Sequence, residues 1–335
     1  MKKFLVVLLI LAVSLALLAA CSGKKAPAAG ASDELKRGDY FITTLSGPTS
    51  GIYYPIGGAF NSFIGQLGYR NSTTATGASA ENINYILTGQ GELAIAMSDA
   101  VIQAYQGYGA FEGKPPATDL RAMMGLWPNV VQIVTTTDTG IKNFEDLRGK
   151  RVGVGAPNSG VELNARMIFE AHNMSYTDCR VDYLSYGEAI EQMKNGMCDV
   201  AFVTSGLGNA TIRELGVTKT IYFVPVEGAG LKKLMELYPF FAEVVIPGSV
   251  YGITANTTTA SVPNIMLVAK SLPNRVVYDL LENFYSTEGV ATIGASHAQA
   301  AEHIKPATAL RGILGTVVPL HDGAIEYYKA KGMIK

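Results

Sequence analysis

The feature that most restricts the possible folds of this chain is a repeated alternation of strand and helix patterns. Short runs rich in apolar and β-branched residues alternate with segments whose apolar residues have helical spacing. The order β-α-β-α-β occurs once at 41–97 and again at 151–203. Consecutive β-α-β units make parallel strands with helices packed on the faces of the sheet, so we expect an α/β protein.

The expected elements follow from this periodicity and from helix-start signals. In the first copy, strand and helix alternate at 41–45, 55–67, 72–76, 79–88 and 92–97. In the second copy, the same alternation falls at 151–155, 159–172, 180–184, 185–194 and 199–203. Outside the copies we expect two strands within 120–138 that meet near Trp127 and Pro128, a strand at 260–270, and helices at 275–286 and 324–331.

The two copies share a register as well as an order. The segment 80–98 matches 187–205 at a constant offset of 107 residues. The general likeness of all βαβ units is the alternative explanation of this match. We expect two similar lobes rather than one large sheet, each a mainly parallel sheet covered by helices. The first lobe is expected at 40–132 plus 250–335 and the second at 133–249, joined by a two-strand hinge.

The first residues have the pattern of a secretory signal. Two lysines precede an apolar run at 4–18, which is short for a membrane span and suits a signal peptide. Leu18, Ala19 and Ala20 then precede Cys21, as in a bacterial lipobox; an ordinary signal peptide with a chance cysteine is the alternative. We expect a signal peptide at 1–20, lipidation of Cys21, and a flexible tether at 21–39 that holds the body at an extracytoplasmic membrane surface.

Composition and motif content exclude several classes of function. Lysine and arginine number 27 against 28 aspartates and glutamates, so no basic field is present to hold nucleic acid. The four histidines and three cysteines have no metal-ligand spacing, and we expect no metal and no cofactor. There is no GxSxG and no P-loop, and Asn158 stands where a dinucleotide fingerprint begun at Gly153 would need glycine. We therefore expect a protein that is not an enzyme.

Small polar residues follow the expected strands of both copies. They lie at 46–51, 76–79 and 98–99 in the first lobe and at 156–160, 185 and 204–206 in the second. Ligands of open parallel sheets bind beyond the carboxyl ends of the strands, where helices begin and free N–H groups favour anions. A small carboxylate between the lobes is the expected guest.

Two serines of these turns have an alternative, purely structural reading. Ser159 and Ser185 each begin an S-x-x-E sequence, the pattern of a capping box, which would engage the hydroxyl locally. The backbone amides of Gly160 and Val161 are therefore better candidates than the Ser159 hydroxyl. The aromatic residues near the turns, which could wall a cleft or pack in the core, are Tyr53, Tyr54, Trp127 and Tyr251.

Taken together, these residues resemble the TAXI family, the extracytoplasmic solute receptors of tripartite TRAP transporters. The resemblance spans about 40–332 and rests on SGPTSGIYYPIGGAF (46–60), ATGASAENI (75–83), GELAIAMSDA (91–100), GIKNFEDLRGKRVGVGAPNSGVE (140–162), YLSYGEAIEQMKNG (183–196), CDVAFVTSGLGNA (198–210) and PLHDGAIEYYKAKG (319–332). It implies a type II periplasmic-binding-protein fold, TRAP membrane subunits as partners, and glutamate, glutamine or a 2-oxoglutarate-like compound as ligand.

The resemblance also implies the residues of the binding site. Those from the first copy are Tyr53, Tyr54, Ser79, Asn82 and Ser98. Those from the second copy are Ser159, Gly160, Val161, Thr204, Ser205 and Gly206. The family is expected to have a tyrosine before the proline, whereas this chain has Trp127 there. The resemblance therefore does not fix the pocket wall or the size of the ligand.

Other functions remain open from the sequence. The chain could be the substrate-binding lipoprotein of an ABC importer or of a sensor kinase, which would bind the same kind of ligand. A structural lipoprotein would bind no small molecule and show no closure. Cys179 and Cys198 precede two strands that are expected to flank a third, a separation of about 9–10 Å that argues against a disulfide.

Overall fold

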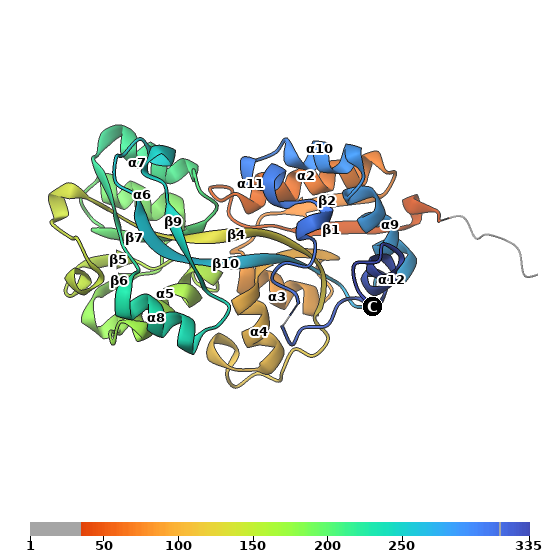
Figure 1. Cartoon of the computed structure of the whole chain (residues 1–335), viewed down its shortest axis with the longest axis horizontal. Coiled ribbons are helices and arrows are strands. Elements are labelled where there is room, and N and C mark those ends of the chain that lie inside the picture. Colours follow the sequence, from red (N-terminus) through yellow and green to blue (C-terminus); the bar gives the residue numbers. More distant parts are fainter. Residues whose placement is uncertain (1–34, 315) are drawn as a thin grey trace, which may run out of the picture. The chain divides into compact units, whose positions relative to one another are not determined.

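The computed structural model describes residues 35–314 and 316–335. The expected signal peptide and the lipid anchor at Cys21 lie outside the described residues, as does most of the expected tether. Within the described part, ten strands belong to one mixed sheet, whose main path is β2-β1-β3-β10-β4-β7-β5-β6. Helices cover both faces of this sheet (Figure 1).

The first lobe is built on three parallel strands. These are β1 (Phe41–Leu45), β2 (Arg70–Thr74) and β3 (Leu93–Met97), with β1 in the middle. The helices that follow them in turn are α2 (Tyr53–Gln66), α3 (Ser79–Leu87) and α4 (Ser98–Gln106). Helix α2 lies on one face of the strands, and α3 and α4 lie on the other (Figure 1).

The second lobe repeats this arrangement, as the sequence register predicts. Its parallel strands are β5 (Arg151–Gly153), β6 (Arg180–Asp182) and β7 (Val200–Ser205), with β5 in the middle. The connecting helices are α5 (Gly160–Ala171) and α6 (Tyr186–Lys194). Ser159 accepts a hydrogen bond from the Glu162 N–H, and Ser185 forms a full capping box with Glu188, so both serines cap their helices.

Two long antiparallel strands, β4 (Arg121–Thr136) and β10 (Thr257–Val268), run through both lobes. Strand β4 pairs with β10 over its first half and with β7 over its second, which makes the sheet continuous. The expectation of two separate strands near Trp127 is therefore wrong. The expected α/β fold of two lobes joined by a pair of strands is confirmed, but the strands of both lobes belong to one continuous sheet rather than to two.

Pro128 lies opposite Pro263 beside a register irregularity of the β4–β10 pair. Both prolines also stand just outside the ladders on their other sides, which begin at Val130 with β7 and at Asn264 with β3. Bulges and ladder ends are where a strand tolerates the missing N–H of proline.

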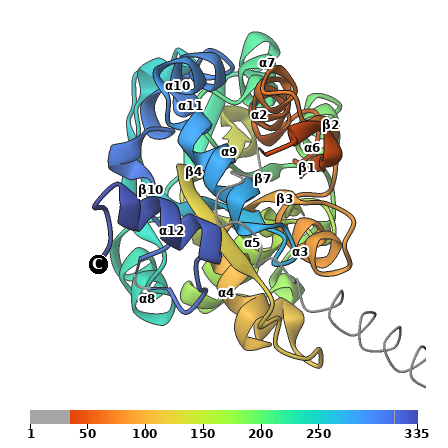
Figure 2. The same ribbon diagram turned by 90° about the vertical axis from the view of Figure 1, so that its right-hand side faces the viewer.

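The remaining elements complete the two lobes. Those between β7 and β10 are α7 (Ala210–Thr218), β8 (Ile221–Val224), α8 (Gly228–Leu237) and β9 (Ala242–Ile246). Those after β10 are α9 (Asn274–Phe284), α10 (Thr287–Gly294), α11 (Ala298–His303) and α12 (Asp322–Ala330). Helix α12 lies beside α9 (Figure 2), and Tyr327 packs edge-to-face on Tyr278 between them.

Burial follows the amphipathic pattern of the sequence. Helix α9 buries Val276, Val277, Leu280, Leu281 and Phe284, which recur on one side at helical spacing. Strands β3 and β7 are buried along their whole lengths, as expected for strands covered on both faces. No helix in the described ranges is long and apolar enough to cross a membrane.

Most expected elements are confirmed, with shifted ends. Helix α2 begins at Tyr53, two residues before the expected start at Pro55, because a proline in the first turn loses no intrahelical hydrogen bond. Strand β2 occupies 70–74 rather than 72–76. The element bounds of α3, α5 and α6 agree with the sequence to within one residue at most ends.

The two described cysteines are free, as the strand order suggests. Their strands β6 and β7 flank β5, and each thiol instead contacts a main-chain carbonyl, Cys179 that of Leu147 and Cys198 that of Val200. We predict that denatured, unreduced mature protein titrates two thiols per chain with a thiol reagent, since Cys21 is expected to be lipidated. A count of zero would contradict the strand order.

Candidate functional site

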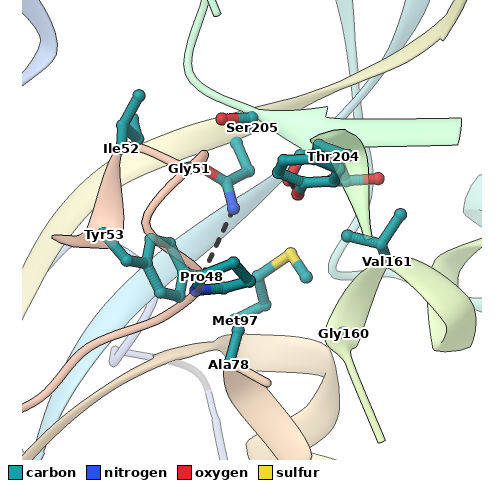
Figure 3. A pocket seen from close by; sticks show the side chains of 12 residues that line it. Pro48, Gly51, Ile52, Tyr53, Ala78, Met97, Gly160, Val161, Thr204 and Ser205 are labelled. Carbon is teal, nitrogen blue, oxygen red and sulfur yellow. Dashed lines mark hydrogen bonds between the residues drawn. The ribbon is translucent and has the colours of Figure 1, made fainter. Parts of the chain in front are cut away.

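A cavity lies where the first turns of five helices meet (Figure 3). It holds about 310 Å³ of empty space, counting the part open to solvent. Its lining residues come from both lobes: Pro48, Gly51, Ile52, Tyr53, Ala78, Met97, Asn129, Gly160, Val161, Tyr186, Thr204 and Ser205. The lining includes the first residue or the N-cap of α2, α3, α4, α5 and α6. The part that water-sized molecules can occupy is only about 20 Å³, close to the room that one water needs. A larger ligand therefore requires the two lobes to separate.

The helix starts give the cavity a positive character. N–H groups in the first turn of a helix have no intrahelical acceptor, and the helix dipole adds partial positive charge at the same end. The Ser159 hydroxyl already accepts from the Glu162 N–H, which leaves the amides of Gly160 and Val161 to face the cavity. The twelve lining residues include no acidic and no basic side chain.

Buried hydroxyl groups add hydrogen-bond donors. Thr204 is 1% exposed, and its Oγ1 has no hydrogen-bond partner in the structure. The Ser205 hydroxyl accepts from the Asn209 side chain at 3.3 Å, so its own proton can point elsewhere. A buried hydroxyl without a partner loses about 1–3 kcal/mol relative to water, which makes Thr204 a candidate ligand contact.

Glycines allow the lobes to approach one another around the cavity. A methyl group at Gly160 would clash with Met97 Cε and lie 2.8 Å from Ser79 Oγ, both in the first lobe. A methyl group at Gly206 would likewise clash with the Ile52 side chain. A larger residue at either position would displace these side chains, so glycine permits the close approach of the lobes seen here.

A hydrogen-bonded network forms one side of the cavity, at the level where Pro128 of β4 lies opposite Pro263 of β10. Trp127 Nε1 donates to Asn129 Oδ1 at 3.0 Å, and Asn129 Nδ2 donates to the Tyr53 hydroxyl at 3.3 Å. Tyr53 in turn donates to Asn264 Oδ1, and Asn264 Nδ2 donates to the Trp127 carbonyl at 2.8 Å. Burial raises the pKa of Tyr53 well above its ordinary value, so its hydroxyl remains protonated.

The backbone is strained at one lining residue. Ala78, the N-cap of α3, has φ 76° and ψ −142°, a conformation that residues other than glycine rarely adopt. Such strain costs about 1–3 kcal/mol and persists only where the surrounding contacts enforce it. It lies where α3 presents its first turn to the cavity.

The structure brings together five of the thirteen site residues expected from sequence. Those lining the cavity are Tyr53, Gly160, Val161, Thr204 and Ser205. Three more lie directly behind the lining: Ser79, Ser159 and Gly206. Ser79 accepts from the Met97 N–H, and Ser159 caps α5, so both hydroxyls are engaged as acceptors within the fold.

The other five expected residues do not line this cavity. Asn82 ties strand ends together, donating to the carbonyls of Ser46 and Ile95. Tyr54 is exposed, whereas Trp127 is fully buried and packs edge-on against Tyr53. Ser98 lines a different cavity, with its hydroxyl unpartnered. The Tyr251 hydroxyl accepts from the N–H groups of Gly208 and Asn209, a structural contact within the second lobe.

Seven further residues line the cavity: Pro48, Gly51, Ile52, Ala78, Met97, Asn129 and Tyr186. Three of them, Pro48, Gly51 and Ala78, lie in the turns at 46–51 and 76–79 that the sequence predicts to face the cleft. Asn129 has no distinguishing local signal, because Pro-Asn occurs four times, at 128–129, 157–158, 263–264 and 273–274. The asparagines of the first and third pairs join the network.

A buried carboxyl group lies at the contact between the lobes. Asp99, in the first turn of α4, accepts from Asn164 Nδ2 of α5 at 2.7 Å, and both side chains are fully buried. Asp99 Oδ1 and Asn164 Oδ1 have no hydrogen-bond partner. Burial raises the pKa of Asp99 to about 7, opposed by hydrogen bonds from main-chain N–H groups and Asn164.

The basic groups near the cleft lie outside the cavity lining. Arg166 is exposed and forms an ion pair with Glu162, one turn earlier on α5. It lines a separate space of about 850 Å³ together with Lys114 and Tyr183. Across residues 35–314 and 316–335, no group of His, Cys, Asp and Glu side chains is placed to hold a metal ion.

Comparisons with known proteins agree with this architecture. The model of the NMT1-like family matches residues 44–332. A protein from Bordetella bronchiseptica RB50 has a similar structure, with a TM-score of 0.52, 13% identity, and coverage of 87% of this chain and 98% of that one. At 13% identity this likeness concerns the fold alone.

Two solved binding proteins have lower similarity scores. The periplasmic aliphatic sulphonate binding protein of Escherichia coli has a TM-score of 0.44 at 12% identity, covering 88% of this chain and 94% of its own. A binding protein component of an ABC phosphonate transporter from Pseudomonas aeruginosa has a TM-score of 0.46 at 13% identity, with 77% and 78% covered.

The Asp99 carboxyl gives a pH-dependent prediction. Its pKa is higher in the folded protein than its usual value near 3.8, so the folded state binds the proton more tightly and stability falls as pH rises from about 4 to about 7. The Asp99→Asn variant lacks this loss and offers an N–H to the unpartnered Asn164 Oδ1. We predict that the melting temperature of the variant, relative to that of wild type at the same pH, is higher at pH 8 than at pH 5.

Asp119→Asn is the matched control. Asp119 is exposed, and its pKa is lowered by its hydrogen bond to Lys270, so it titrates below both test pH values. Its melting-temperature difference from wild type should be the same at pH 5 and pH 8. An Asp99→Asn difference that is equally constant would contradict the burial of an ionisable carboxyl group at the lobe contact.

Proposed function

This chain belongs to the NMT1-like family, and from that premise we propose that it is an extracytoplasmic solute receptor that captures a small anion between its lobes. The observation that carries the proposal is the meeting of five helix starts from both lobes around a cavity that contains the unpartnered Thr204 hydroxyl. Helix N-termini and unpaired donors are the groups that bind anions without a basic side chain.

We further propose that the ligand is a small carboxylate, with glutamate, glutamine and 2-oxoglutarate-like compounds as the first to test. In this proposal the membrane partner is a pair of TRAP transport subunits, and acylated Cys21 holds the receptor at the membrane. The protein acts by binding and delivery and carries out no reaction. Receptors for an ABC importer or a sensor kinase would use the same cavity, so the partner must be tested separately.

In this proposal the lobes close over the ligand. The ligand meets the helix starts of one lobe first, and rotation about the β4–β10 crossing then brings those of the other lobe to it. A ligand favours the closed form only by the contacts that it makes there and not in the open form. In this proposal Gly160, which faces Met97 and Ser79 across the cleft, and Val161, which lines the cavity, supply such contacts.

The proposed function is tested first by thermal unfolding with candidate ligands. The protein is unfolded and refolded to remove any retained ligand, then heated with amino acids, dicarboxylates, 2-oxoacids and sugars. A ligand present at 100 times its Kd stabilises the folded state by about 2.7 kcal/mol, which raises the melting temperature by a few degrees. We expect a shift with small carboxylates and none with sugars. No shift with any compound would contradict the receptor proposal.

A substitution at the lobe contact tests the closure step. Gly160→Ala places a methyl group against Met97 and Ser79, so we predict at least about a tenfold loss of affinity for the ligand found above. The reduction in radius of gyration that wild type shows on ligand binding should also be lost in small-angle scattering.

The matched control is Gly58→Ala. Gly58 lies in α2 of the first lobe, and nothing comes within 4 Å of a methyl group there. Its affinity should equal that of wild type, and its stability should rise slightly because alanine favours helix. Unchanged affinity in Gly160→Ala would show that the ligand binds elsewhere.

A further inference from the structure

Helices α4 and α5 meet across the boundary between the lobes, and their contact contains a buried polar pair. Asn164 Nδ2 of α5 donates to Asp99 Oδ2 of α4 at 2.7 Å, and both side chains are fully buried. About one turn further along each helix, Gln103 Nε2 of α4 contacts Met167 Sδ of α5 at 3.8 Å. Because Asp99 and Asn164 face each other across the boundary, separation of the lobes replaces their contact by water.

This acid–amide contact, formed by Asp99 and Asn164, has one hydrogen-bond donor too few. Asp99 Oδ1 and Asn164 Oδ1 are both buried without a hydrogen-bond partner. An ionised carboxyl group has only acceptors, and an amide oxygen is an acceptor too, so neither oxygen can satisfy the other. A proton on Asp99 removes a charge from the interior and supplies one O–H donor where none is present.

No basic side chain offsets the charge of an ionised Asp99. Burial raises the pKa of Asp99 to about 7, against the opposing effect of the Ala100 and Asp99 N–H groups and the Asn164 amide. The nearby phenols of Tyr53 and Tyr108 are uncharged, because burial and then the Asp99 charge raise the pKa of each. Strands β3 and β10 and the short helix η2 (Gly109–Phe111), which pack on α4, contain no ionisable residue.

The acidic and basic residues of α3 and α5, the other two helices packed on α4, have partners of their own. Glu81 of α3 accepts from the Tyr85 hydroxyl at 2.6 Å. Glu162 of α5 forms an ion pair with Arg166. Glu170, further along α5, accepts a hydrogen bond from a tyrosine hydroxyl at 2.6 Å. None of these groups bonds to the buried carboxyl group, so a proton is the simplest way to neutralise it.

Resting on the lobe closure of the proposed function, we propose that the acid–amide contact takes up one proton when the lobes close and releases it when they open. In the open form water surrounds the carboxyl group and its pKa returns toward the ordinary value near 3.8. Lower pH therefore favours the closed form, and this preference is lost as pH rises through about 7. Because linkage is reciprocal, a ligand that closes the lobes binds more tightly at lower pH.

The direction of proton movement distinguishes this contact from a histidine at another contact between the lobes. His297 precedes α11, and a methyl group at Gly206 of the second lobe would lie 3.0 Å from Gln299 of that helix. Burial and the charge of Arg213, on α7, lower the pKa of His297. A histidine whose pKa falls on closure releases a proton, whereas Asp99 takes one up.

The test compares binding of 2-oxoglutarate, glutamate and glutamine to the refolded full chain at pH 6 and pH 8 by calorimetry. The charges of these probes hardly change between the two pH values. For a probe that binds, the affinity at pH 6 divided by that at pH 8 should be about tenfold larger in wild type than in Asp99→Asn, which keeps the size of the side chain and cannot ionise. Asp119→Asn, the exposed control, should give the wild-type ratio.

Proton counting gives a second readout, which needs no variant to fold. Calorimetry at pH 7 in buffers of different ionisation enthalpy measures the protons exchanged when a probe binds to wild type. We expect net uptake of up to about half a proton per molecule bound, because the carboxyl group is about half protonated at this pH in the closed form and ionised in the open form. Net release, or no exchange, would overturn the inference.

The outcomes separate this inference from the function on which it rests. A wild-type ratio no larger than that of Asp99→Asn would overturn the inference and leave the receptor function standing. Failure of all three probes to bind would count against the proposed ligands, and small-angle scattering of the ligand-free protein then decides the inference. The inference requires a larger radius of gyration at pH 8 than at pH 6 in wild type and equal values in Asp99→Asn. Equal values in wild type would overturn it.

Discussion

The pairing of β4 with β10 is the constraint on which the rest of the structure depends. These two strands pass through both lobes, so they fix which helix starts can meet and where the lobes can turn. Where Pro128 of β4 faces Pro263 of β10, neither residue has an N–H to donate. Hydrogen bonding of the two strands is therefore weaker at this point. The asparagines that follow these prolines lie on either side of the proline pair and hold Tyr53 through hydrogen bonds. One short segment of each strand therefore supports a wall of the cavity.

The electrostatics of the site follow from this placement. Helix starts and oriented side-chain donors supply its positive potential, while the ionisable groups of the surroundings are paired or set back from the lining, as Arg166 is with Glu162. Fixed dipoles of this kind need no reorganisation when a ligand arrives, which is the advantage of a preorganised site. Asp99 is the exception, because it is buried at the lobe contact without a basic partner.

Sequence reasoning predicts the elements and the general location of the site, and it fails where tertiary contacts decide. The periodicity and the caps at Ser159 and Ser185 are local, so α5 and α6 are predicted closely. Whether Pro128 ends a strand depends on Pro263, 135 positions later, which no local pattern reveals. Tyr53 and Tyr54 are neighbours of the same residue type, yet only Tyr53 is buried in the cavity wall because α2 turns it inward. Asn129 is missed because its role requires Trp127 and Tyr53 together.

A crystal structure of the complex with the tightest-binding anion tests the central claim most directly. The account predicts acid oxygens within about 3 Å of first-turn amides from both lobes, those of α5 at Gly160 and Val161 included, and of Asn129 Nδ2. It also predicts that Thr204 Oγ1 gains a partner. An anion bound instead at Arg166 and Lys114, in the larger space between α3 and α5, would contradict it, because a pair of basic side chains and not the helix starts would then hold the ligand.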